Sequence, residues 1–297
     1  MRHHTLCTVV AVAAIGAACS IDVRGDDTVI REEKRFTVSG QPELQLRTFD
    51  GSIRLKSWDR NEILVEIERR GPDAETARRL TVDTSQQGNR VVIEVPEPRE
   101  GRDRIHFGSW QSPSVSLVVT APRRMTLDAR TGDGSIAADD LAGSIVLNTG
   151  DGSIRVRRVE GGLRARTGDG SISISDVNGQ LEAESGDGSI DVGGRLEAVN
   201  VRSGDGSVRV DADQGSVVKS DWNITTGDGS ISVHLPGNID AELDAHSNDG
   251  RVRADDFNGL TRSDRDDDSG SVRGRLGRGG RSLRVRSGDG SITISRR

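Results

Sequence analysis

The stretch TGDGSIRV at residues 149–156 joins a glycine-rich corner to a tail in which apolar and polar residues alternate. Close copies of this corner recur along the second half of the chain. The second glycine of the corner falls at Gly134, Gly152, Gly170, Gly188 and Gly206, 18 residues apart each time, and then at Gly229, Gly250, Gly270 and Gly290, at spacings of 23, 21, 20 and 20. A period near 20 residues is typical of a solenoid in which each repeat forms one coil.

The alternation of residue types predicts which side chains face the interior of each coil. Leu163, Ala165 and Thr167 share one parity before a corner, and Ile172 and Ile174 share one parity after it. A weaker corner, such as Asn178-Gly179-Gln180-Leu181, lies midway through most coils, so each coil should hold two strands and two turns. We expect glycine at the main corner because the chain would turn there through positive backbone angles. Nine coils stacked about 4.8 Å apart would form a rod roughly 40 Å long.

The composition fits a thin, repetitive structure. Aromatic residues make up 2% of the 297 residues and charged residues 30%, so a thick globular core is excluded. The hydrophobic residues are nevertheless spaced regularly, which a disordered polar chain would not require. The sequence therefore predicts an all-β protein dominated by a β-solenoid, expected to be a right-handed parallel β-helix with 18–23 residues per coil.

A smaller strand-rich region with one short helix is predicted at residues 35–122, before the solenoid at 123–297. Apolar alternation at 53–55 and 63–67, on either side of a polar turn, predicts a hairpin. Asp73 can cap a helix that continues to Leu80. Two further strands are predicted at 91–95 and 115–119, with a turn at 86–89, and Pro122 separates this region from the repeats.

The N-terminus has the pattern of an export signal: a short basic start, an apolar run and small residues before Cys19. Residues 1–18 resemble a bacterial lipoprotein signal, which implies cleavage before Cys19 and acylation of that residue, although Gly16 stands where such signals usually have leucine. Ordinary secretory cleavage with an unmodified Cys19 is the alternative. Ser20 after the cysteine implies the outer membrane, and residues 19–34 read as a polar tether.

Three features together resemble the bacterial family named "putative adhesins". They are TFDGSIRLKSWDRNEILVEI at 48–67, VVTAPRRMTLDARTGDGSI at 118–136, and the run of corners. The resemblance covers most of the mature chain and implies a β-solenoid on an exported lipoprotein. It also implies a role in adhesion, with an unidentified protein or glycan as the ligand.

The corners also carry aspartates that would stack into a ladder: Asp133, Asp151, Asp169, Asp187, Asp205 and Asp228. Neighbouring carboxylates would repel by about 1 kcal/mol in water. We expect each aspartate to accept a hydrogen bond from the amide two residues on and so close its own turn. The alternative is a calcium ion between successive rungs. Asp264, Asp266 and Asp268 have the alternate spacing of a calcium loop, but Ser269 and Arg275 occupy its glycine and glutamate positions, so we expect a solvated turn there.

No catalytic motif stands out in the remaining sequence. The phosphate-binding GxxxxGK, the nucleophile turn GxSxG and the zinc motif HExxH are all missing. His106, His234 and His246 are expected on strand faces. After loss of residues 1–18 the formal charge is −7, which gives no indication of nucleic-acid binding. The sequence predicts a non-catalytic envelope scaffold without a cofactor. The alternatives are a calcium-stabilised repeat and a carbohydrate-active β-helix enzyme, for which the adjacent Asp255 and Asp256 would be the candidates.

Overall fold

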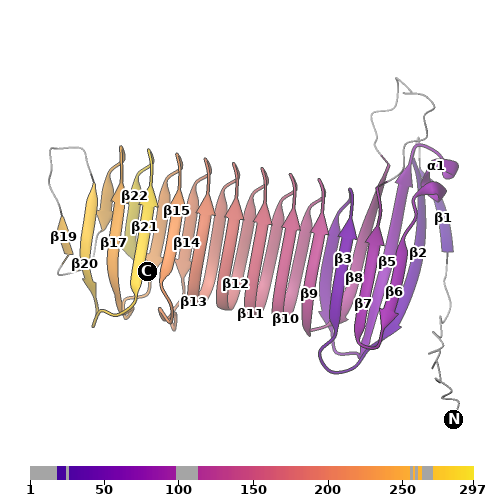
Figure 1. The fold of residues 1–297 in the computed structure, drawn as a ribbon, viewed down its shortest axis with the longest axis horizontal. Coiled ribbons are helices and arrows are strands. Elements are labelled where there is room, and N and C mark those ends of the chain that lie inside the picture. Colours follow the sequence, from indigo (N-terminus) through magenta and orange to yellow (C-terminus); the bar gives the residue numbers. More distant parts are fainter. Residues whose placement is uncertain (1–18, 25–26, 98–112, 255–256, 258–259, 263–269) are drawn as a thin grey trace, which may run out of the picture.

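The computed structural model describes residues 19–24, 27–97, 113–254, 257, 260–262 and 270–297. They form a rod of two facing β-sheets joined along both long edges by the turns of successive coils (Figure 1). We call the sheet whose strands leave the GDGS corner sheet I and the sheet whose strands return to it sheet II. No helix among the described residues has the length and hydrophobicity needed to cross a membrane. The predicted all-β solenoid is confirmed.

Four central coils show the 18-residue repeat most clearly. Each is one long strand, bent in the middle, that contributes to both sheets: β10 (Ile136–Thr149), β11 (Ile154–Thr167), β12 (Ile172–Ser185) and β13 (Ile190–Ser203). They pair in parallel, and in β10–β12 each residue lies beside the residue 18 positions later. The middle bend is the predicted second corner, where Arg158 and Gly161 of β11 adopt φ angles of 53° and 114°.

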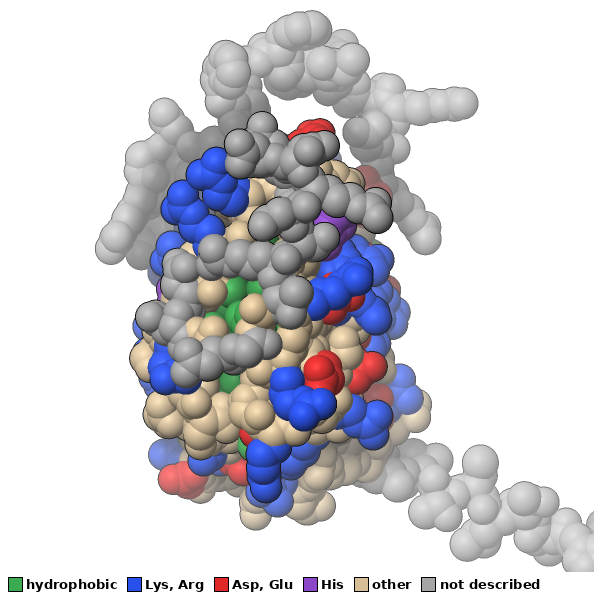
Figure 2. Space-filling model, turned by 90° about the vertical axis from the view of Figure 1, so that its left-hand side faces the viewer, with side chains coloured by type: hydrophobic (Ala, Val, Ile, Leu, Met, Phe, Trp, Pro, Cys, Tyr) green, Lys and Arg blue, Asp and Glu red, His purple; other side chains and the backbone are tan. Residues whose placement is uncertain are grey.

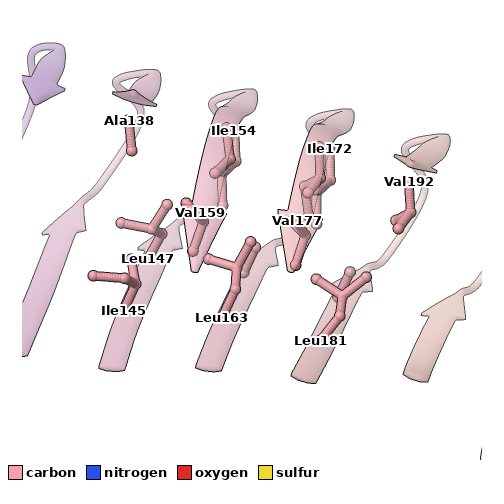
Figure 3. Packing of buried hydrophobic residues seen from close by; sticks show 14 of the residues in the cluster. Ala138, Ile145, Leu147, Ile154, Val159, Leu163, Ile172, Val177, Leu181 and Val192 are labelled. Atoms are coloured by element: carbon pink, nitrogen blue, oxygen red, sulfur yellow. The ribbon is translucent and has the colours of Figure 1, made fainter. Parts of the chain in front are cut away.

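The core is a single layer of aliphatic side chains between the two sheets. The inward residues of each coil stack on those of the next, as Figure 3 shows for Ile154 and Ile172 and for Leu163 and Leu181. All four are at most 3% exposed, so the predicted inward parity is confirmed. Burial of such residues contributes about 25 cal/mol per Å² of apolar surface, which allows a core with few aromatics to stabilise a long rod.

The N-terminal region continues both sheets. It contains β3 (Glu43–Thr48), β4 (Ile53–Trp58), β5 (Glu62–Gly71), helix α1 (Ala74–Arg79), β6 (Asp83–Gln87), β7 (Arg90–Val95), β8 (Ser114–Pro122) and β9 (Arg124–Thr131). The coil β3–β4 lies between the coil β7–β8 and the coil that begins with β9. The chain therefore does not add its coils in sequence order at this end.

Two predictions for this region are confirmed and one is wrong. Asp73 caps α1 by accepting a 2.7 Å hydrogen bond from the Thr76 amide, and β6 and β7 form a hairpin through the predicted turn. The predicted hairpin of β4 and β5 does not form. Strand β8 lies between them, parallel to β4 and antiparallel to β5. This apolar strand, distant in sequence, pairs with the edge of β4 and the edge of β5 that would otherwise pair with each other.

The tether predicted at residues 19–34 is also wrong. Strand β1 (Cys19–Arg24) pairs antiparallel with β2 (Asp27–Thr37), and β2 pairs with β5. The apolar residues Ile30 and Phe36 alternate with polar ones along β2 and are buried, at 4% and 8% exposure. The charged residues between them obscured this strand pattern in the sequence.

The C-terminal end also departs from sequence order. Its strands are β14 (Val208–Ala212), β15 (Trp222–Thr226), β16 (Ile231–Leu235), β17 (Ala241–Ser247), β18 (Val252–Ala254), β19 (Leu260–Arg262), β20 (Ser271–Leu276), β21 (Ser282–Ser287) and β22 (Ile292–Arg296). The last coil, β21–β22, lies between the coil β15–β16 and the coil β17–β18. It therefore fills a position inside the stack.

Gly270 does not form a stacked corner as predicted. It precedes β20, which runs antiparallel to β17 and, with the antiparallel β19, ends sheet II. The DGSI stretch at Gly51 instead supplies an additional corner, on which Gly134 stacks. Sheet I runs from β1 to β18 and sheet II from β6 to β19, so at about 4.8 Å per strand the rod is roughly 60 Å long, longer than expected.

Candidate interaction surfaces

The glycines of the main corner are required for a reason other than the predicted one. The second glycines of the stacked corners have φ angles outside the left-handed region. A Cβ atom on Gly170 would lie 2.2 Å from the carbonyl oxygen of Gly152 in the preceding coil, and one on Gly152 would lie 2.1 Å from that of Gly134. The coils approach too closely at this edge for any side chain, so the predicted positive angle is wrong and close approach explains the glycine.

A row of buried hydroxyl groups closes the same corners. The Thr167 hydroxyl donates to the Gly152 carbonyl of the preceding coil at 2.8 Å and accepts from the Gly170 amide of its own coil at 3.2 Å. Equivalent bonds are made by Thr149, Ser185, Ser203, Ser287 and Ser247. Each hydroxyl therefore links two coils and holds a turn, which satisfies backbone groups that would otherwise be buried without partners.

The predicted aspartate ladder exists, but its side chains do not close the turns. Asp133, Asp151, Asp169, Asp187, Asp205 and Asp228 are all exposed, and the ladder continues to Asp289 and Asp249. Within the described part of the chain, no hydrogen bond or ion pair involves these carboxylates. The expectation that each accepts from an amide two residues on is wrong: the turn is held instead by the buried hydroxyl, which accepts from the amide of the glycine after the aspartate, as at Gly170 and Gly188. No group of three or more potential metal ligands occurs among the described residues.

Replacing Asp169 by Asn tests the ladder. Because the carboxylate closes no turn and faces its neighbours about one strand spacing away, we expect the free energy of unfolding to stay constant or rise slightly, with no response to calcium. Thr167→Val should cost about 1–3 kcal/mol, because it leaves a buried carbonyl and amide unpaired. Urea unfolding with and without calcium measures both. A calcium-dependent stabilisation of the wild type that Asp169→Asn abolishes would instead favour metal ions on the ladder.

The other predicted residues divide into two groups. His234 lies on β16 with its Nδ1 2.5 Å from an Asp211 carboxylate oxygen, and His246 lies on β17, so both are on strands as expected. The remaining candidates lie outside the described residues: His106, Asp255, Asp256, Asp264, Asp266 and Asp268. Cys19 begins β1, opposite Glu32 in the register.

The outer face of sheet II carries ion pairs that cross from coil to coil. Glu182 of β12 accepts hydrogen bonds from Arg164 and Arg166 of β11, at 2.7 and 2.6 Å, and Glu184 lies 3.3 Å from Arg166. Burial tends to raise the pKa of Glu182, but the hydrogen bonds and charges of the two arginines outweigh it and hold that pKa below its usual range. These exposed pairs add little stability and leave the face close to electrical neutrality.

A shallow groove runs along the rod on this face. Two rows of outward residues line it, one residue from each of β10, β11, β12 and β13 in each row. The first row is Ser144, Gly162, Gln180 and Ala198, and the second row is Val146, Arg164, Glu182 and Asn200. Ser220 and Asp221, from the long connection between β14 and β15, line its far end. The cavity volume is about 330 Å³.

The C-terminal tip has a different chemical character. Figure 2 looks along the rod at the end formed by β19 and β20 and shows Lys and Arg side chains around a small group of apolar ones. Arg273, Arg275 and Arg278 pair with Asp244, Glu242 and Asp240, so much of this positive charge is compensated. The tip therefore offers less unpaired charge than its arginine content suggests.

The family model of Toastrack DUF4097 matches residues 41–295, which include every central coil and both out-of-order coils. The chain belongs to the Toastrack DUF4097 family. No curated protein matches this toastrack chain.

Three solved structures are similar to this toastrack over most of its length. A "putative lipid binding protein" from Parabacteroides distasonis ATCC 8503 has 15% identity and a TM-score of 0.45, covering 89% of this chain and 96% of its own. A "putative adhesin" from Bacteroides fragilis NCTC 9343 has 11% identity and a TM-score of 0.33, covering 90% and 97%. A "putative cell adhesion protein" from Clostridium sporogenes ATCC 15579 has 16% identity and a TM-score of 0.28, covering 90% and 100%. Similarity at this level carries no argument about ligands.

Proposed function

We propose that this toastrack is an exported, lipid-anchored protein that acts as a non-catalytic interaction scaffold of the cell envelope, in the manner of an adhesin. The observation that supports this most is the rod itself. Its outward side chains form continuous rows across successive coils, so equivalent positions recur about every 4.8 Å along both faces. Such a surface suits an extended partner that binds to the rod through many weak contacts.

The N-terminal leader supplies the localisation. The export pattern of residues 1–18 and the cysteine that follows favour acylation of Cys19 and retention in the outer membrane. Cys19 is also the first residue of β1, which pairs with β2 at the N-terminal end of sheet I. An anchor there would attach the rod by that end and direct β17–β20 away from the membrane (Figure 1).

The anchor is tested by Cys19→Ala. If Cys19 is acylated, the wild-type protein should partition into detergent with the membrane fraction, whereas Cys19→Ala should be released into the soluble fraction. Fractionation followed by mass spectrometry of the N-terminal peptide measures this directly. Soluble wild-type protein with an unmodified cysteine would contradict the anchor.

The scaffold role is tested by cross-linking in intact envelopes, followed by capture of the tagged chain with and without a calcium chelator. We expect the same envelope component to be recovered under both conditions, because no group of three or more potential metal ligands occurs in the described part of the chain. Recovery only in calcium would favour the calcium-stabilised alternative. Conversion of an envelope polysaccharide by the purified protein would contradict a non-catalytic role.

A further inference from the structure

The groove on sheet II combines polar groups that have no partner with a small apolar surface. Ser144, Gln180, Asn200 and Ser220 line it, are exposed, and make no side-chain hydrogen bond within the described part of the chain. Between them they offer hydroxyl and amide groups that both donate and accept. Val146 and Ala198 supply the apolar contacts. A ligand for this groove would therefore combine several hydroxyl or amide groups with some apolar surface.

The charges of the groove disfavour an anionic ligand. Arg164 is already paired with Glu182 at 2.7 Å, and the Asp221 carboxylate accepts a 3.1 Å hydrogen bond from the Ser282 amide. A polyanion would meet these two carboxylates, and no unpaired cation stands among the lining residues to compensate. Nucleic acids and acidic polysaccharides are therefore poor candidates.

The direction and period of the groove favour a linear polymer. The groove crosses four coils, and its two rows repeat with the spacing of parallel strands, about 4.8 Å. One pyranose ring with a β-1,4 linkage has nearly this length, so successive sugars of such a chain can lie on successive coils, with alternate sugars turned over. An extended peptide fits less well, because it binds by adding to an exposed sheet edge, whereas the backbone groups of this face are already paired between coils.

From these observations we infer that the groove binds a neutral, extended β-1,4-linked glycan along the rod axis, with one sugar residue on each coil. This inference rests on the proposed scaffold function and gives its ligand a chemical class. Gln180 and Asn200 would donate and accept hydrogen bonds with sugar hydroxyls, while Val146 and Ala198 would contact the apolar face of the rings. The Arg164–Glu182 pair would form one wall and contribute both a donor and an acceptor.

Gly162 provides a sharp test because it lies in the middle of the first row. A Cβ atom built on it meets nothing within 4 Å, and its φ angle is outside the left-handed region. Gly162→Tyr should therefore fold normally and fill the groove. Gly193→Tyr is the matched control, since this glycine lies on the outer face of sheet I, where an added Cβ makes only ordinary contacts of 3.9 Å or more.

The experiment titrates the purified mature chain, without its lipid, with cellohexaose, chitohexaose and the coiled isomer maltohexaose, and follows binding by NMR and calorimetry. We expect the two extended glycans to bind and maltohexaose to bind at least about tenfold more weakly. Gly162→Tyr should weaken binding at least about tenfold and Gly193→Tyr should not change it. Gln180→Ala and Asn200→Ala should each weaken binding about three- to tenfold, as expected for the loss of one or two hydrogen bonds.

Two outcomes overturn the inference: no binding of either extended glycan by the folded wild type, or equal binding by Gly162→Tyr with an unchanged melting temperature. Equal binding of maltohexaose would contradict the extended geometry. The proposed scaffold function fails separately. If Cys19 is acylated and an envelope partner is captured but no glycan binds, only the groove inference is wrong. If the protein binds glycan but its Cys19 is unmodified, the groove inference stands and the proposed lipid anchor is wrong.

Discussion

Gly170→Val should lower the free energy of unfolding by about 3 kcal/mol, because the new Cβ atom would lie 2.2 Å from the Gly152 carbonyl oxygen and 2.9 Å from the Ser153 amide nitrogen. Both of these atoms belong to the backbone, so no flexible side chain can move aside. Relief requires the two coils to separate at this edge, which also lengthens the hydrogen bond from the Thr167 hydroxyl to the Gly152 carbonyl of the preceding coil. Urea unfolding of the mature chain measures the loss.

Gly162→Val is the control for this substitution. It introduces the same side chain into β11, the strand that leads to this corner, at a site where nothing lies within 4 Å of the new Cβ atom. We expect its stability to be unchanged or slightly higher, since valine favours strands. If Gly170→Val and Gly162→Val unfold at the same urea concentration, the close approach of the corner backbones is not the reason that glycine recurs at regular spacing along the chain.

Removal of the last coil should have the second large effect. Truncation after Arg281 deletes β21 and β22, on which β17 and β18 stack, although β17 and β18 come earlier in the sequence. Deletion also exposes Ile224 and Val233, which are completely buried in the intact protein. We expect residues 241–276 to become protease-sensitive while the coils from β10 to β13 remain protected. Limited proteolysis with mass spectrometry distinguishes these regions.

A sequential solenoid would behave differently, because loss of its final coil would leave every earlier coil with its own neighbour. A point substitution provides a second test that keeps the chain length. Val285→Asp places a charge at a fully buried position of the inserted coil and should reproduce the sensitivity of 241–276, whereas Arg284→Asp, at the adjacent exposed position, should not. Equal protection of residues 241–276 in the truncated and intact chains would contradict the inserted position of β21–β22.

The sequence was sufficient for the repeat unit but not for the order of the units. The 18-residue spacing and the parity of residues such as Leu163 and Ile172 predict the central coils, because these signals are local. The position of β21–β22 could not be predicted, since every coil presents nearly the same faces to its neighbours and the motif at Gly290 fits between any two of them. The strand β8 was predicted, but its position between β4 and β5 was not, because these pairing partners are distant from it in sequence.

For the candidate surfaces, too, the sequence revealed the local repeats but not the contacts between coils. The aspartates and glycines of the corners were recognised by their repetition, but their roles depend on distances between coils, which no single repeat contains. Thr167 was expected to face inward, yet its two hydrogen bonds depend on the Gly152 carbonyl of another coil. The groove could have been located by aligning the outward positions Ser144, Gly162, Gln180 and Ala198, which are mostly small. That the polar side chains among them make no hydrogen bond within the described residues is evident only from the structure, which also shows the ion pairs beside them.

The out-of-order coils at the two ends have a consequence for how this protein can change in size. Both ends interlock segments from different parts of the chain, so an insertion there would disturb several coils at once. Among the described strands, β11 pairs only with β10 and β12, and β12 pairs only with β11 and β13, so these central coils contact only their neighbours in sequence. Duplication of one 18-residue unit in this segment would therefore extend the reach of the protein by about 4.8 Å and lengthen the groove by one binding position, while both ends stay intact. The molecule is thus adjustable in length at its centre and fixed at its extremities.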